Sequence, residues 1–91
     1  MTDYGWTVAA VDELGEVRPV AEGTATDPEK AWSEALSAAE SAVIERPAAV
    51  EYRITAAGET ATLRPGRTET GERDAAAALE SLAGLREARR A

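Results

Sequence analysis

The chain has 91 residues, of which 44% are hydrophobic and 30% charged, and its formal net charge at pH 7 is −7. It contains no Cys, His, Asn or Gln. Disulfides, thiolate metal sites and catalysis by a thiol or an imidazole are therefore excluded. A chain of this length makes one small domain, so we expect a single domain over residues 1–91.

The first elements in chain order form a predicted hairpin. Residues 6–11 alternate in a way that is typical of a strand, a turn follows at 12–15, and residues 16–23 return as a second strand. Pro19 has no N–H to donate, so the second strand lies at a sheet edge or is bulged at that residue. Charged residues along this strand discourage pairing with other chains: Glu16, Arg18 and Glu22.

A helix is predicted next. Thr26 with Glu29 fits a capping box, and Asp27 before Pro28 fits a cap followed by proline at the first helical position. The helix ends before Pro47, because a proline disfavours helical geometry at the preceding residue. Its apolar face carries Trp32, Leu36, Ala39 and Val43, and beside it runs a stripe of small residues, Ala31, Ala35, Ala38 and Ala42.

The second half repeats this order. Strands are predicted at 50–55 and 59–64, and they are joined by a turn around Ala57 and Gly58. Thr70 is the predicted cap of a second helix that runs to about Arg89, with Ala75, Ala78, Leu79, Leu82 and Leu85 on one face. Within that helix Gly84 is less favourable than alanine by up to about 1 kcal/mol.

These elements predict an α+β fold of order ββαββα, a four-stranded antiparallel sheet with two helices on one face. Both helices lie on one face because the other face is polar, with Glu51, Arg53 and Thr55. The order forms tandem hairpin-helix units over roughly 4–46 and 48–90. TATDPEKA (24–31) is loosely echoed by TETGERDA (68–75), and convergent capping chemistry explains the echo nearly as well as duplication does. We expect Trp6, Trp32 and the leucines of the second helix to build the core.

The residues offer little catalytic or ligand-binding chemistry. Acids are scattered on turns and polar helix faces, and none lies within an apolar strand face that would raise its pKa. The acids at 12, 13 and 16 lack the pattern of a calcium loop, and no phosphate-binding glycine motif is present. We therefore expect no enzyme activity, no cofactor and no metal site.

Arginines are the candidate interaction residues. Arg53 and Arg64 fall on the polar face and edge of the predicted sheet, and Arg86, Arg89 and Arg90 continue the apolar stripe of the second helix. Three interpretations of these last arginines remain open. They complement the helix dipole, they belong to a frayed end, or they meet acids of another copy or protein.

The predicted function is a small non-enzymatic protein-interaction or regulatory module, most simply a homodimer. One alternative is a nucleic-acid-associated accessory protein that uses the arginine-bearing sheet edge and the last helix. Another is an acidic protein that occupies a basic nucleic-acid-binding surface. The longest uncharged run, YGWTVAAV, is too short to span a membrane, and the first residues do not resemble a signal peptide. We therefore expect a cytoplasmic protein.

Overall fold

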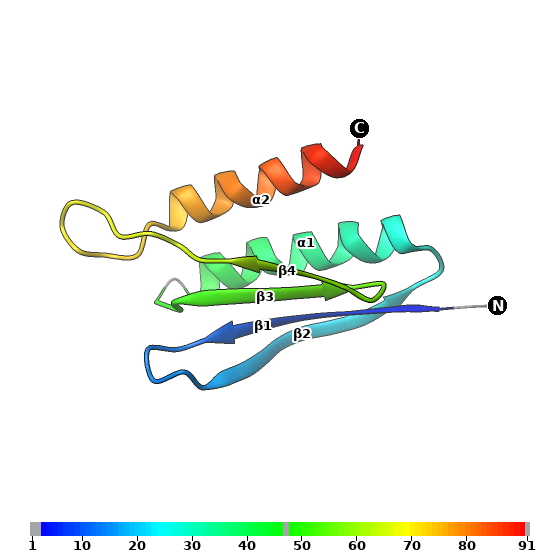
Figure 1. The fold of residues 1–91 in the computed structure, drawn as a ribbon, viewed down its shortest axis with the longest axis horizontal. Helices are drawn as coiled ribbons and strands as arrows, with labels where there is room; N and C mark the ends of the chain where they lie inside the picture. Colours follow the sequence, from blue (N-terminus) through cyan, green and yellow to red (C-terminus); the bar gives the residue numbers. More distant parts are fainter. Residues whose placement is uncertain (1–2, 47, 91) are drawn as a thin grey trace.

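The computed structural model describes residues 3–46 and 48–90, and it has the order ββαββα (Figure 1). The elements are β1 (Tyr4–Val11), β2 (Val17–Ala25), α1 (Pro28–Glu45), β3 (Glu51–Ala56), β4 (Glu59–Leu63) and α2 (Ala75–Arg90). The predicted α+β fold is confirmed.

One antiparallel sheet joins the four strands in the order β2-β1-β3-β4. The first strands of the two hairpins, β1 and β3, are therefore central, and the second strands, β2 and β4, lie at the edges. Both helices lie on one face of the sheet (Figure 1), as expected. Within residues 3–46 and 48–90, neither helix is long and apolar enough to cross a membrane.

β2 is both an edge strand and a bulged one. Its register against β1 runs from Val8↔Ala21 to Ala9↔Pro19, which leaves Val20 as an extra residue on β2. A β-bulge of this kind accommodates a proline that cannot take part in the ladder. The prediction made from Pro19 is confirmed.

The β3–β4 hairpin has a two-residue loop. Ala57 and Gly58 both have positive φ, 51° and 80°, and the flanking residues Ala56 and Glu59 are partners in the ladder. Positive φ at both loop positions is the geometry of a type I′ turn, whose twist matches that of the flanking strands. This short loop fixes the register of β4 on β3.

α1 begins and ends with specific polar contacts. The Asp27 carboxylate accepts a hydrogen bond from the Lys30 N–H at 2.7 Å, and Pro28 occupies the first helical position. At the other end, the Tyr52 hydroxyl donates to the carbonyl of Arg46, the C-cap residue. These contacts satisfy backbone groups that a helix end leaves unpaired. Burial also raises the pKa of the Tyr52 hydroxyl.

The second helix begins later than the sequence predicts. The Thr68 N–H donates to the Glu72 carbonyl and Gly71 has a φ of 86°, so Thr70 lies in a turn instead of capping a helix. The N–H of Ala77 instead donates to the Asp74 carboxylate at 3.0 Å. The capping residue of α2 is therefore Asp74, the counterpart of Asp27, and the prediction of Thr70 as the cap was wrong.

The core lies between the helices and the inner face of the sheet. Its largest fully buried side chains are Tyr52, Leu36, Ile54, Leu82, Val8 and Val43. The alanines of α1 at 31, 35 and 39 are also fully buried, so this helix lies close to the sheet. Trp32 is buried, whereas Trp6 is half-buried at the margin of the core and packs against it.

Gly23 and Gly5 form a matched pair that tests the packing of Trp6. A Cβ on Gly23 would stand 2.6 Å from Cζ2 of Trp6, whereas a Cβ on Gly5 would meet nothing within 4 Å. We expect Gly23→Ala to lower the free energy of unfolding by about 1–3 kcal/mol, because the ring must move. Gly5→Ala should leave it unchanged or raise it slightly. Urea denaturation of both variants measures this, and equal effects would contradict it.

Candidate interaction surface

The face of the sheet that points away from the helices, called here the outer face, is not covered by either helix (Figure 1). The strand registers place its side chains in rows across the sheet. One row runs Thr7, Thr55, Thr60, and the next runs Ala9, Arg53, Thr62. The Thr55 and Thr60 hydroxyls lie 3.2 Å apart within hydrogen-bonding distance. The outer face therefore presents hydroxyls and guanidinium groups on its β3–β4 side.

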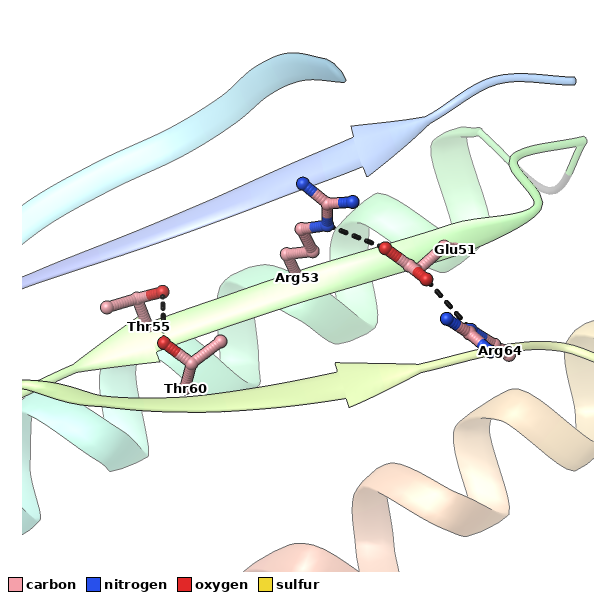
Figure 2. A network of polar contacts seen from close by, with 5 residues as sticks. All are labelled: Glu51, Arg53, Thr55, Thr60 and Arg64. Carbon is pink, nitrogen blue, oxygen red and sulfur yellow. Dashed lines mark hydrogen bonds and ion pairs between the residues drawn. The ribbon is translucent and has the colours of Figure 1, made fainter. Parts of the chain in front are cut away.

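Glu51 holds both predicted arginines of this face (Figure 2). Its carboxylate accepts a hydrogen bond from Arg53 Nε at 2.6 Å and another from Arg64 Nε at 2.8 Å. Glu51 is only 7% exposed, whereas the side chains of Arg53 and Arg64 are 50% and 77% exposed. The structure thus brings these two residues together around one buried carboxylate.

This arrangement has a defined electrostatic character. The hydrogen bonds from Arg53 and then Arg64 hold the pKa of the Glu51 carboxyl below its usual value of 4.5, although desolvation acts in the opposite direction. Two guanidinium groups and one carboxylate carry a net charge of +1. Both hydrogen bonds use Nε. The terminal nitrogens of each guanidinium therefore remain available to donate to acceptors other than Glu51. A locally positive group therefore stands on the surface of an acidic chain.

The other predicted arginines lie elsewhere and make contacts within the chain. Arg86 donates to Ser37 and Glu40 of α1, each at 3.1 Å. Arg89 lies over the ring of Trp32, 4.4 Å from its centroid, and is 3.5 Å from a carboxylate oxygen of Glu59. The side chain of Arg90 lies outside the described residues. Arg86 and Arg89 thus fasten α2 to α1 and to the start of β4.

The free edge of β4 carries backbone groups that point away from the sheet. In a hairpin with a two-residue loop, the residues that flank the loop exchange both hydrogen bonds, and the pairs alternate from there. Ala56↔Glu59, Ile54↔Ala61 and Tyr52↔Leu63 are therefore the bonded pairs. The N–H and C=O groups of Thr60 and Thr62 point outward, and no backbone contact from another described segment reaches them.

The two edges of the sheet differ in how they are protected. β2 carries a proline, a bulge and charged side chains, all of which oppose pairing with another strand. β4, with the sequence ETATL, has neither proline nor bulge, and its register on β3 is continuous. Thr60 and Thr62 are exposed. Of the two edges, β4 is therefore the one that carries neither a proline nor a bulge.

Other surface features offer less chemistry. A shallow hollow at the opposite end of the outer face is lined by one acid, one tryptophan, two glycines and three threonines: Glu22, Trp6, Gly5, Gly23, Thr7, Thr24 and Thr55. Among residues 3–46 and 48–90, no group of three or more acids is placed to hold a metal ion.

Sequence reasoning placed Glu51 on the outer face but missed its burial and its pairing with Arg64. It also missed the unprotected edge at Thr60 and Thr62. Both could have been found from the two-residue loop, because that loop sets Tyr52 opposite Leu63 and so brings Arg64 beside Glu51.

The depressed pKa of Glu51 predicts a pH-dependent contribution to stability. A carboxyl whose pKa is lower in the folded chain stabilises the fold above its unfolded value, and this contribution is lost as the pH falls through the folded pKa. We expect Glu51→Gln to lower the free energy of unfolding at pH 7, and this difference to shrink below about pH 4.5. Urea denaturation from pH 7 to pH 3 measures it.

The exposed loop residue Glu69 provides the matched control, Glu69→Gln, which should change the free energy of unfolding little at pH 7. A Glu51→Gln deficit that stays constant down to pH 3 would contradict the account.

Comparison of the chain with protein-family models, with curated proteins and with solved structures finds no match.

Proposed function

We propose that the protein is a non-enzymatic protein-interaction module that binds an extended segment of a protein partner along the free edge of β4. The observation that carries this proposal is the outward-pointing backbone of Thr60 and Thr62 on an edge strand that has neither a proline nor a bulge. Adding a strand to an exposed sheet edge is a common way for domains to bind protein segments, because backbone hydrogen bonds supply affinity that is largely independent of sequence.

The side chains beside this edge add selectivity. An added strand would run next to Thr60 and Thr62 and would pass Arg64, whose side chain is largely exposed. Glu51 holds Arg64 by its Nε, so the terminal nitrogens of the guanidinium have a fixed position. A carboxylate on the added strand near Arg64 would gain a charge-assisted hydrogen bond, which contributes about 0.2–1 kcal/mol at so exposed a side chain.

The groups on this surface support binding more than catalysis. Both oxygens of the buried carboxylate Glu51 already accept arginine hydrogen bonds, so it is poorly placed to act as a base. The neighbouring hydroxyls, Thr55 and Thr60, pair with one another. The outer face therefore presents donors at fixed positions, which suits recognition.

Site-specific photo-crosslinking in the source cells tests the proposal. A benzophenone amino acid in place of Thr60 sits at the β4 edge, and the same group in place of Ser41, on the exposed side of α1, is the matched control. We expect a light-dependent protein adduct from position 60 and none from position 41. The mass of the adduct minus the 9.6 kDa of the chain gives the mass of the partner.

Two results would overturn the proposal. One is the absence of any adduct at position 60, or equal adducts at both positions. The other is an adduct at position 60 that nuclease treatment removes, which would assign the edge and Arg64 to nucleic acid.

A further inference from the structure

We infer that the strand added at the β4 edge is β4 of a second copy of this chain, paired antiparallel about a two-fold axis through Ala61. This inference rests on the proposed function and names its partner. The result is a dimer with one continuous eight-stranded sheet. A two-fold interface of this kind is self-complementary. If one residue of the first copy contacts a second residue of the other copy, the reverse contact is also made.

The register follows from which backbone groups are free. With the axis at Ala61, Thr60 of each copy lies opposite the partner's Thr62, so all the outward-pointing groups of both strands enter bonded pairs. The whole of Glu59–Leu63 is then paired with itself. A shift by two residues in one direction would set Thr60 opposite Arg64, which lies beyond the end of β4, and in the other direction would set Thr62 opposite the turn residue Gly58.

The second layer of the dimer must also fit. α1 contacts β1, β2 and β3, whereas α2 contacts β4 and α1, so α2 lies at the β4 edge of the sheet. In the eight-stranded sheet, α2 of one copy therefore becomes the neighbour of α2 of the other. The side of α2 that turns away from α1 decides whether this approach is possible.

That side of α2 carries small residues. At about 100° per residue, Ala78, Leu82 and Arg89 point toward α1 and the sheet, in agreement with the burial of the first two and the contacts of the third. The opposite lateral side then carries Ala77, Ser81, Gly84 and Ala88. These side chains let a second helix come close, so α2 does not obstruct the pairing of the strands.

Gly84 also lies at the height of the proposed axis. Arg89 contacts Glu59, which fixes α2 along the direction of β4. Gly84 is five helical residues before Arg89, or about 7.5 Å at 1.5 Å per residue. Ala61 is two strand residues after Glu59, or about 6.8 Å. Gly84 thus lies at about the same position along the strand direction as Ala61, the residue on the proposed axis.

Nothing within the described chain accounts for a glycine at this position. A Cβ on Gly84 would meet nothing within 4 Å, and its φ is not in the left-handed region. Glycine in a helix interior is destabilising relative to alanine. A partner helix that packs closely against α2 at this position would explain why residue 84 has no side chain.

Sedimentation equilibrium over a range of concentrations tests the inference. We expect the wild-type chain to reach twice its mass of 9.6 kDa. Thr62→Pro removes an outward N–H without touching the ladder to β3, and should weaken dimerisation at least about tenfold. The matched control Thr62→Val keeps the N–H and should not.

Gly84→Leu provides a second, independent test. Leucine should raise the thermal stability of the dilute monomer, because it favours the helix and has open space around it. It should also weaken dimerisation at least about tenfold, because it fills the helix–helix contact. A merely structural role for Gly84 would not produce these opposite effects.

The outcomes separate the two proposals. Two results overturn this inference. One is a wild-type chain that remains monomeric up to millimolar concentration. The other is a dimer that is unaffected by Thr62→Pro, by Gly84→Leu or by both. If the chain is monomeric and the crosslink at Thr60 captures a different protein, the inference fails while the proposed function stands. If a dimer forms that responds to neither change and Thr60 gives no crosslink, both fail.

Discussion

The close contact between the alanine face of α1 and the inner face of the sheet is the constraint on which the rest of the structure depends. Ala31, Ala35 and Ala39 have no exposed surface, so the helix lies directly on the strands. Each alanine buries little apolar area compared with leucine. The larger side chains Tyr52 and Ile54 fill the remaining space. A chain of this composition can build one such layer, and the other face of the sheet stays open.

The open face is stabilised by polar contacts in place of a second layer. Glu51 lies beneath Arg53 and Arg64, and their hydrogen bonds satisfy a carboxylate that burial would otherwise penalise. Such an arrangement fixes the arginines while leaving their outer ends in solvent. Together with the free edge of β4, it places on one side of the sheet the groups that we propose bind another protein. Because the core is small, the second copy that we propose would add stability by extending the sheet and its helical cover.

Much of the fold could be predicted from the sequence because local rules determine it. Pro19 indicated an edge or a bulge, Asp27 with Pro28 a helix start, and Ala57 with Gly58 a tight turn. Thr70 misled because it matches Thr26 in the echoed stretch, whereas Gly71 turns the chain first and leaves the capping role to Asp74. The candidate surface was harder to predict, since the burial of Glu51 and the free groups of Thr60 depend on the register between strands. Alternation alone predicts which face of the sheet a residue lies on, but not which residues of the adjacent strands lie beside it.

The most direct measurement of the central claim is an isotope-filtered NOE experiment on a mixture of labelled and unlabelled chains. In the proposed dimer Ala61 and the partner's Ala61 form a non-hydrogen-bonded pair, whose α-carbons lie about 4.5 Å apart. The account predicts intermolecular α-proton contacts at Ala61. Intermolecular contacts that involve β2 or the outer face instead of β4, or none at concentrations where the chain is dimeric, would contradict it.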